Sequence, residues 1–178
     1  MTRTLTEAVT QCDAVITSGG VSVGDFDYVS DALERIAADD ATGASRVDWY
    51  QVAIKPAKPL AFGTLGAVPV FGLPGNPVSS RVSFELFARP ALRQLAGHGD
   101  VLPEPVVAVA ISPLPRRADG RMHFDRVRVR YDGGRYLCER AGVQASNVLS
   151  GMAAASGLAI VADGDGVEAG ETVPVILL

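Results

Sequence analysis

Apolar residues follow two different periods along the chain, and the period changes near residue 100. In the first part, short apolar runs alternate with segments in which apolar residues recur every three or four positions. The clearest helical face comprises Val29, Ala32, Leu33, Ile36 and Ala37.

Strands are expected at residues 14–17, 47–54 and 68–72. Helices are expected to end near residue 11 and to begin near residue 77, the second with a kink at Pro90. This alternation predicts an α/β unit with a largely parallel sheet.

The second part of the chain has the pattern of a small all-β domain. Strand-like runs occur at residues 106–111, 121–131, 135–138, 158–162 and 172–178. Turn residues separate these runs, which is typical of a barrel or a sandwich. We therefore predict an α/β domain over residues 1–98 and a β domain over residues 103–178. The first domain has few strands and begins in a helix, so it resembles the second half of a domain that is truncated or that another chain completes.

Composition narrows the class of protein further. Of the 178 residues, 48% are hydrophobic and 20% are charged, which excludes a disordered chain. The net charge of −4 is spread evenly, so we expect no nucleic-acid partner. The N-terminus has no apolar signal region and no apolar run approaches the length of a membrane span, and Cys12 and Cys138 belong to no cluster. We expect a cytoplasmic protein with free thiols and no membrane association.

Two glycine-rich loops follow predicted strands. The first contains Ser18, Gly19, Gly20, Ser22 and Gly24. The second contains Pro74, Gly75, Asn76 and Pro77, with Asn76 as a candidate N-cap. Ligands of open α/β sheets bind outside the carboxyl ends of the strands, and unpaired backbone N–H groups there favour anions. Either loop could also be an ordinary tight turn.

Charged residues near these loops suggest oxyanion chemistry. Asp25 and Asp27 follow the first loop, where Asp27 could cap a helix or hold Mg²⁺ beside a phosphate. The chain has 14 arginines but only two lysines, Lys55 and Lys58, and each precedes a proline. An extended backbone before proline can direct both ammonium groups at a tetrahedral oxyanion.

Arginines also alternate with apolar residues on one predicted strand. Arg126, Arg128 and Arg130 lie on one face of residues 121–131, and the apolar residues between them lie on the other. A solvated strand face is the simplest interpretation of the three arginines.

A hydrolase is a weaker alternative. Residues 20–24 (GVSVG) match the G-x-S-x-G nucleophile motif around Ser22. A catalytic triad would also need a histidine, and the chain offers only His98 in the predicted linker and His123 in the β domain.

Three ordered segments together resemble the MoeA/gephyrin E-domain family of molybdopterin molybdenumtransferases. They are residues 13–28 (DAVITSGGVSVGDFDY), 54–63 (IKPAKPLAFG) and 72–79 (GLPGNPVS). Residues 120–126 (GRMHFDR), 144–146 (QAS) and 168–175 (EAGETVPV) add weaker similarity. The resemblance covers nearly the whole chain and corresponds to the C-terminal portion of longer family members. It implies part of a MogA/MoaB-like molybdopterin-binding α/β domain, followed by a β-barrel-like C-terminal domain.

The resemblance also implies an activity and its residues. The family inserts molybdate into adenylated molybdopterin with release of AMP, aided by Mg²⁺. By position, Asp27 matches the acidic residue after the first loop, and Lys55 and Lys58 match basic residues near phosphate and molybdate. The remaining matches are Pro74, Pro77 and Ser79 in the second loop, and Arg126 and Ser146 in oxyanion binding. A homodimer, or association with the missing N-terminal portion, is implied as well.

Some positions depart from the family pattern, and one alternative function remains. Gln51 stands where some members carry lysine, and Ala57 stands where glycine is usual. Ala145 and Asn147 replace the glycine and histidine usual around Ser146. A truncated, non-catalytic module that binds molybdopterin or acts as a scaffold is the alternative to an enzyme.

Overall fold

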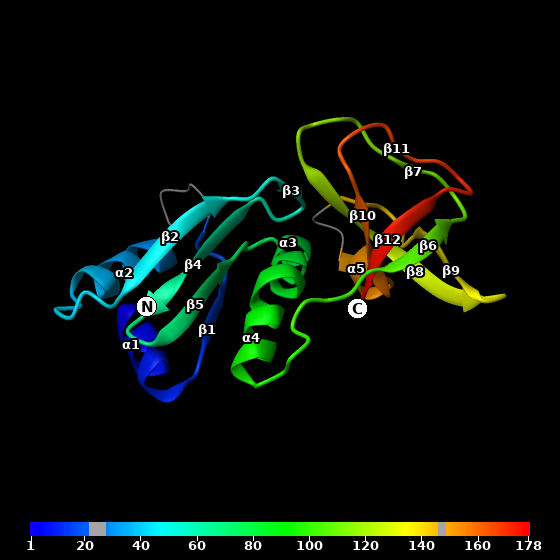
Figure 1. Cartoon of the computed structure of the whole chain (residues 1–178). Helices are drawn as coiled ribbons and strands as arrows, with labels where there is room; N and C mark the ends of the chain where they lie inside the picture. Colours follow the sequence, from blue (N-terminus) through cyan, green and yellow to red (C-terminus); the bar gives the residue numbers. More distant parts are fainter. Residues whose placement is uncertain (22–27, 146–148) are drawn as a thin grey trace. The chain divides into compact units, whose positions relative to one another are not determined.

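The computed structural model describes residues 1–21, 28–145 and 149–178, which form two compact units (Figure 1). The first unit comprises Met1–Val52 and Ala57–Gly97, and the second comprises Ala53–Pro56 and His98–Leu178. Residues 53–56 thus belong with the second unit although they interrupt the first in sequence. The sequence pattern gives no sign of this excursion, and the division into residues 1–98 and 103–178 stays a prediction.

The first unit contains a mixed four-stranded sheet. Its strands are β1 (Val15–Ser18), β2 (Arg46–Gln51), β4 (Pro59–Leu65) and β5 (Val68–Leu73). They lie in the order β1-β5-β4-β2, and only β1 and β5 are parallel. The prediction of a largely parallel sheet is therefore wrong for the described residues. It failed because β4 lies in a stretch rich in proline and glycine, and its Pro59 occupies the first strand position, where a missing N–H is tolerated.

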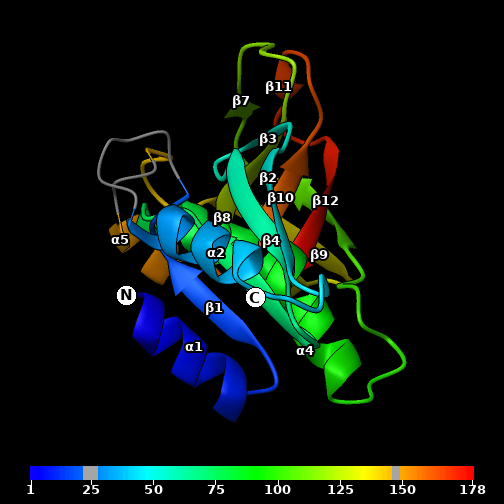
Figure 2. The same ribbon diagram turned by 90° about the vertical axis from the view of Figure 1, so that its left-hand side faces the viewer.

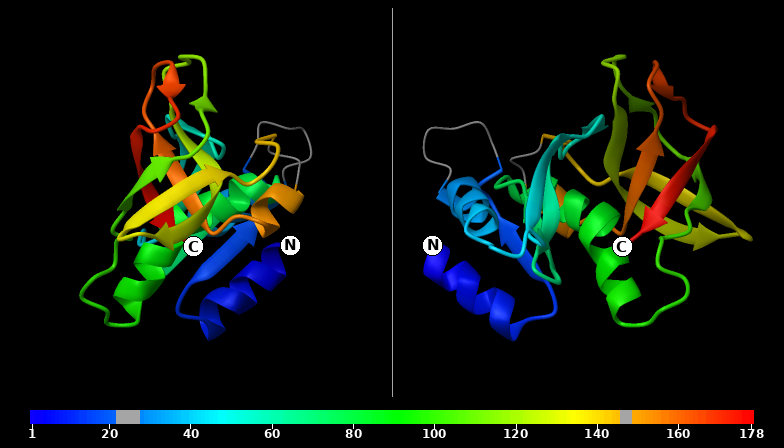
Figure 3. Two further views of the ribbon diagram at one scale, coloured as in Figure 1. Left: turned by 90° about the vertical axis from the view of Figure 1, so that its right-hand side faces the viewer. Right: turned by 60° about the vertical axis from the view of Figure 1, so that its left-hand side comes forward.

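Helices pack on both faces of this sheet. Helices α1 (Thr2–Gln11) and α2 (Tyr28–Ala38) bury Leu5 and Leu33 against one face. Figure 2 shows α2 in front of the sheet. On the other face Leu60, Phe71 and Leu73 pack against Ala88 of the helical segment that follows β5 (Figure 3, right). None of the helices in the described ranges is long and apolar enough to span a membrane.

The helical segment after β5 changes its winding in the middle. It consists of α3 (Pro77–Ser83), a π-helical turn (Phe84–Ala88) and α4 (Arg89–Leu95). The predicted irregularity at Pro90 takes the form of this wide turn, and Pro90 itself lies in the first turn of α4, where its missing N–H costs least. The turn also carries the buried Glu85, which forms ion pairs of 2.7 and 2.6 Å with Arg81 and Arg89.

The second unit is a closed five-stranded barrel, which confirms the predicted barrel-like domain. Its strands are β6 (Val106–Ala110), β8 (Met122–Asp132), β9 (Arg135–Arg140), β10 (Gly157–Val161) and β12 (Thr172–Leu177). They follow the order β10-β12-β6-β9-β8, and pairing of β10 with β8 closes the ring. Strand β3 (Ile54–Lys55) adds to the free end of β8. The short pair β7 (Leu114–Pro115) and β11 (Gly166–Val167) and helix α5 (Leu149–Ala153) were not predicted.

Small side chains fill the barrel. Its buried core comprises Ala108, Ala110, Leu114, Val127, Cys138, Ala159, Val161, Val173 and Val175. A barrel of few strands has a narrow interior, which explains the preference for alanine and valine. Cys138 is part of this core, and burial raises the pKa of its thiol. Cys138 and the exposed Cys12 are both free.

Strands β2 and β4 approach closely at Gly63, which yields a stability prediction. A Cβ atom added there would lie 2.6 Å from the Cα of Val47 and would also clash with the carbonyl oxygen of Arg46. We expect Gly63→Ala to lower the free energy of unfolding by about 2 kcal/mol or more, because the backbones must separate. Urea unfolding followed by circular dichroism measures this. Gly99→Ala is the control, since a Cβ there meets nothing within 4 Å; equal midpoints for the two variants would contradict the prediction.

Candidate functional site

The two glycine-rich loops lie side by side at the carboxyl ends of β1 and β5. The strands are parallel neighbours, with Ser18 opposite Leu73. The N–H of Gly19 donates to the carbonyl of Leu73 at 2.8 Å. Gly19 has φ +100°, and a Cβ added to Gly75 would lie 3.4 Å from the Cα of Gly19. The left-handed conformation at Gly19 favours glycine, and the two glycines let the loops meet without side chains between them.

Asn76 caps helix α3, as its position in the sequence predicts. Its side chain accepts hydrogen bonds from the N–H groups of Val78 at 3.1 Å and Ser79 at 3.3 Å. The N–H of Ser80 donates to the carbonyl of Asn76 at 2.8 Å, and Pro77 has no N–H. The expectation of unpaired N–H groups at this helix start is wrong, because the cap uses them. An anion here would meet side-chain hydroxyls and the positive helix end instead.

Hydroxyl groups tie the first loop to its surroundings. The Oγ atoms of Ser18 and Ser80 lie 3.3 Å apart, which joins the first loop to helix α3. Ser30 donates to the carbonyl of Gly20 at 2.7 Å and accepts from the indole N–H of Trp49 at 3.2 Å. Sequence reasoning missed Ser30 and Trp49, because both act on the loop from a distance along the chain. Ser22, Gly24, Asp25 and Asp27 lie outside the described residues.

Lys55 and Lys58 flank a tight turn. The Lys55–Pro56 peptide is cis, and Ala57 is a buried residue with φ +81°. This left-handed conformation explains why glycine would be usual at position 57. The N–H of Val52 donates to the carbonyl of Lys58 at 2.7 Å. Lys58 thus belongs to the first unit, whereas Lys55 lies on β3 of the second.

Asp119 is the carboxylate beside Lys55. Its Oδ2 lies 3.7 Å from Nζ of Lys55, and Nε2 of His123 and Nη2 of Arg116 each lie 3.1 Å from Oδ1. The register between β3 and β8 brings Lys55 opposite His123. A hydrogen bond from Arg121 above all, and then one from His123, holds the pKa of Asp119 well below its usual range. Sequence reasoning regarded the segment around Asp119 only as a turn, although an acidic residue next to glycine could have suggested more.

Asp163 fixes the turn that carries Asp119. Its carboxylate accepts hydrogen bonds of 3.0 Å from the N–H groups of Asp119 and Gly120. Arg116, nearly buried, donates to the carbonyls of Val161 and Ala162. The acid beside Lys55 is therefore part of a cross-linked turn.

Arg126 is a cationic side chain that is almost completely buried. It is 1% exposed, so the expectation of a solvated strand face is wrong at this position, because residues 143–145 and Gly151 of α5 cover the side chain; Arg128 and Arg130 are exposed as predicted. Its Nη2 donates to the carbonyls of Val143 at 2.7 Å and Ala145 at 3.2 Å. Nε and Nη1 are buried and have no hydrogen-bond partner among the described residues. Burial lowers the pKa of Arg126, and nearby Asp125 partly offsets this.

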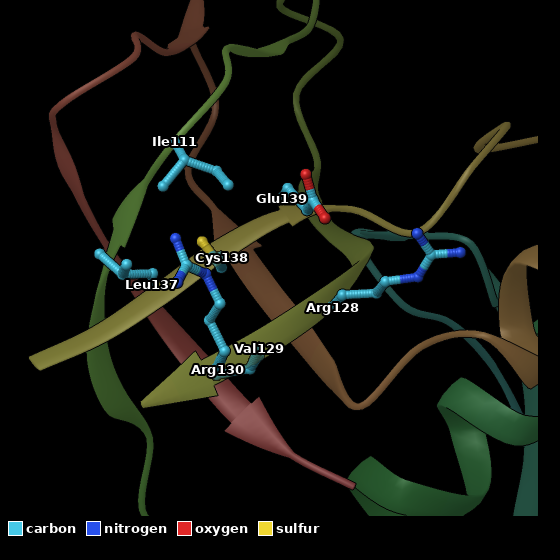
Figure 4. A pocket seen from close by; sticks show the side chains of 7 residues that line it. All are labelled: Ile111, Arg128, Val129, Arg130, Leu137, Cys138 and Glu139. Atoms are coloured by element: carbon cyan, nitrogen blue, oxygen red, sulfur yellow. The ribbon is translucent and has the colours of Figure 1, made fainter. Parts of the chain in front are cut away.

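A small hollow lies on the outside of the β8–β9 hairpin (Figure 4). It has a volume of about 250 Å³ and is lined by Ile111, Arg128, Val129, Arg130, Leu137, Cys138 and Glu139. Arg130 forms an exposed ion pair with Asp132 at 3.0 Å. None of the predicted site residues lines this hollow, so it adds nothing to the candidate site.

The described residues contain no group of three or more histidine, cysteine or acidic side chains that could hold a metal ion. Asp27, the predicted metal ligand, and Ser146, the predicted neighbour of Arg126, lie outside those residues. The part of the chain that the structure describes therefore offers oxyanion contacts but no protein cage for a cation.

Comparison with protein families assigns each part of the chain. Residues 1–94 match the model described as probable molybdopterin binding domain, and residues 113–178 match the MoeA C-terminal region (domain IV). These ranges correspond to the α/β unit and the barrel, although residues 53–56 group with the barrel.

Individual proteins that resemble this chain in sequence are molybdopterin molybdenumtransferases and a gephyrin. A molybdopterin molybdenumtransferase of Haemophilus influenzae is 34% identical over 94% of this chain and 40% of its own length. Molybdopterin molybdenumtransferase 2 of Mycobacterium tuberculosis is 38% identical over 82% of this chain and 35% of its own. Gephyrin of Dictyostelium discoideum is 33% identical over 98% of this chain and 27% of its own. The chain thus spans less than half the length of these relatives.

Solved structures agree with the fold. A molybdenum cofactor biosynthesis protein from Pyrococcus furiosus superposes with a TM-score of 0.67 at 25% identity, over 99% of this chain and 53% of that one. A molybdopterin biosynthesis MoeA protein from Pyrococcus horikoshii superposes with a TM-score of 0.71 at 26% identity, over 99% and 40%.

The cap of α3 gives a second stability prediction. Asn76→Ala removes the acceptor for two backbone N–H groups, so the free energy of unfolding should fall by about 1 kcal/mol. Asn76→Asp keeps an acceptor and should retain most of the stability. Urea unfolding of the three proteins tests this, and an alanine variant as stable as the aspartate variant would speak against the cap.

Asp119 gives a prediction on pH. Its pKa is lower in the folded protein than the ordinary 3.8, so its stabilising contribution is complete above that value and is lost as the pH falls below it. We expect Asp119→Asn to lower the urea midpoint at pH 7 and to flatten its decline in acid. Asp132→Asn, which removes only the exposed pair with Arg130, is the control and should keep the wild-type profile. Parallel acid profiles of wild type and Asp119→Asn would refute the prediction.

Proposed function

Since the chain belongs to the MoeA/gephyrin E-domain family of molybdopterin molybdenumtransferases, as its C-terminal portion, we propose that it acts in inserting molybdate into adenylated molybdopterin with release of AMP. The observation that carries the proposal is the buried Arg126, whose Nε and Nη1 have no partner among the described residues. A buried guanidinium with two free donors is costly unless an acceptor meets it. A tetrahedral oxyanion is a chemically matched acceptor.

The other cations fit the same anionic substrates. Lys55 has a half-exposed side chain, and its Nζ lies 3.7 Å from Oδ2 of Asp119, so an incoming anion can contact it without displacing a short hydrogen bond. We assign Lys55 and Arg126, with Ser146, to molybdate. Lys58 would contact a phosphate oxygen as a point charge. Fixed positive groups of this kind stabilise charge that develops when a phosphoanhydride bond breaks.

The glycine-rich loops suit the phosphate groups of the adenylated substrate. Residues 18–20, with Ser22, Gly24 and Asp25, and the second loop from Pro74 to Pro77 with Ser79 would bind there. The contact of Gly19 with Gly75 keeps bulky side chains out of this edge of the sheet. Because the cap of Asn76 uses the N–H groups of α3, we assign binding to hydroxyls and to the helix dipole.

Magnesium enters the proposal through Asp27. Mg²⁺ in phosphate sites is commonly held by one or two carboxylates together with substrate oxygens, so it needs no cluster of three protein ligands. The lack of such a cluster among the described residues is compatible with an ion that the substrate shares. When bound, Mg²⁺ would polarise the phosphoanhydride.

Assembly and location extend the proposal. More than half of the Haemophilus relative lies outside the region that this chain matches. We propose that full activity requires association with such an N-terminal portion, or a second copy of this chain in a homodimer. Free thiols fit a reducing compartment, so we place the protein in the cytoplasm.

A binding or scaffold module is the second candidate, because Arg126 and Lys55 could hold an anion whether or not a reaction follows. The hydrolase alternative stays a prediction, because Ser22 lies outside the described residues. Of the two histidines, His123 contacts Asp119 through Nε2, and His98 is an exposed residue outside the helices and strands.

Reconstitution tests the proposal. The chain is mixed with adenylated molybdopterin, molybdate and Mg²⁺, with and without the N-terminal portion of the Haemophilus relative, and both molybdenum cofactor and AMP are measured. Lys55→Ala, Lys58→Ala, Asp27→Asn and Arg126→Lys should each reduce product formation by about tenfold or more. The two lysine variants lose a charge contact to substrate, Asp27→Asn weakens a Mg²⁺ ligand, and Arg126→Lys keeps the charge but loses the Nε and Nη1 donors. Asn76→Asp should also reduce it, since it adds a negative charge beside the loops.

Arg130→Lys is the matched control, because Arg130 is exposed on the same strand as Arg126. If neither mixture yields cofactor, the enzymatic assignment fails. Tight binding of the substrate that Lys55→Ala and Asp27→Asn leave unchanged would instead establish the binding module.

A further inference from the structure

Gln144 replaces a missing strand beside Arg126. The ladder between β8 and β9 ends with the pair of Val127 and Arg140, so the backbone of Arg126 has no strand partner on that side. The N–H of Arg126 donates to Oε1 of Gln144 at 2.9 Å, and Nε2 of Gln144 donates to the carbonyl of Arg126 at 2.9 Å. The N–H of Ala141 donates to the same carbonyl at 2.9 Å. A side-chain carboxamide thus provides the two hydrogen bonds that a peptide group of a neighbouring strand would provide.

The residues on each side of Gln144 hold the guanidinium of Arg126. The carbonyls of Val143 and Ala145 accept from Nη2 at 2.7 and 3.2 Å. Gly151 of α5 closes the surroundings, because a Cβ there would lie 3.2 Å from the carbonyl oxygen of Val143 and 3.6 Å from Nε. Residues 143–145 therefore form hydrogen bonds with both the backbone and Nη2 of Arg126. Nε and Nη1 remain as the donors that have no partner in the described part of the chain.

We propose that Gln144 is a positioning residue for oxyanion binding: its two hydrogen bonds fix the backbone of Arg126, and the carbonyls on either side of Gln144 hold Nη2, so that Nε and Nη1 remain as the donors for the anion. The inference rests on the proposed function, because Arg126 is the group that would meet the oxyanion. Gln144 itself touches no substrate in this scheme. Its contribution is geometric, since a guanidinium fixed in advance loses less freedom when the anion binds.

The chemistry of the carboxamide makes the inference specific. Only a group with one donor and one acceptor at the end of a three-carbon side chain can meet both the N–H and the carbonyl of Arg126. Methionine has a similar length but forms neither hydrogen bond well, so Gln144→Met separates hydrogen bonding from volume. Asparagine keeps both groups but is one methylene shorter, so it tests reach.

The experiment uses the full chain and molybdate as the probe. Isothermal titration calorimetry measures molybdate affinity, and nitrogen-15 NMR measures hydrogen exchange at Nε–H of Arg126. Gln144→Met should weaken molybdate binding on the order of tenfold and should speed Nε–H exchange by a similar factor, as is usual when a supporting residue behind a ligand contact is removed. Val143→Ala is the control, because its backbone carbonyl still accepts from Nη2 and its side chain is exposed.

The outcomes separate this inference from the proposed function. If Gln144→Met binds molybdate like wild type and keeps the Nε–H protected, the inference is wrong although Arg126 can still bind the anion. If wild type binds no molybdate and Arg126→Lys changes nothing, the proposed role of Arg126 fails, and the exchange rate alone decides whether Gln144 holds the guanidinium. If circular dichroism shows that Gln144→Met does not fold, Gln144→Asn takes its place in both measurements.

Discussion

Pairing along β8 is the constraint on which the candidate site of the second unit depends. This strand pairs with β3 at residues 122–123, with β10 over residues 123–127 and with β9 over residues 127–132, so each of its residues has a strand partner on at least one side. Pairing with β10 closes the barrel, and pairing with β3 brings Lys55 opposite His123. Where the pairing with β9 ends, residues 143–145 and Gly151 cover the side chain of Arg126. Lys55 and Arg126, the predicted cations of this unit, thus owe their positions to one strand.

In the first unit, the corresponding constraint is the single parallel pair of the sheet. Because β1 and β5 run in the same direction side by side, the loops that follow them emerge at the same edge. The rest of the sheet is antiparallel and serves to bury Leu60, Phe71 and Leu73 under the helical segment. One pair of parallel strands is therefore enough to bring two loops together at one edge of the sheet, and Gly19 and Gly75 allow the loops to come into contact.

The sequence predicted those parts of the structure in which local pattern and tertiary environment agree. The five barrel strands were predicted because each is a strand-like run bounded by turn residues, a signal that is local in the sequence. Strand β4 was missed because its proline and glycine resemble a turn, and without β4 the sheet looked parallel. Arg126 was misjudged because alternation shows which residues share a face but not what covers that face.

Some site residues could not be predicted because they act across space. Asp119 lies 64 positions from Lys55 in the chain, and Gln144 is 18 positions from Arg126. In the sequence both look like ordinary polar loop residues, because their contacts with Lys55 and Arg126 form only in the folded barrel domain. The family resemblance supplied Lys55, Lys58 and Arg126 as candidates, but it could not supply the groups that hold them.

The excursion of residues 53–56 affects how the two units can unfold. The chain leaves the first unit after Val52, adds β3 to the barrel and returns at Ala57, before it crosses again after Gly97. Proteolysis at the segment after Gly97 would therefore not release an intact barrel, because β3 would stay with the other fragment and the end of β8 would lose its neighbour. Residues 53–56 are connected at both ends to the first unit and pair with β8 of the second. We therefore expect the thermal unfolding of one unit to destabilise the other through this four-residue segment.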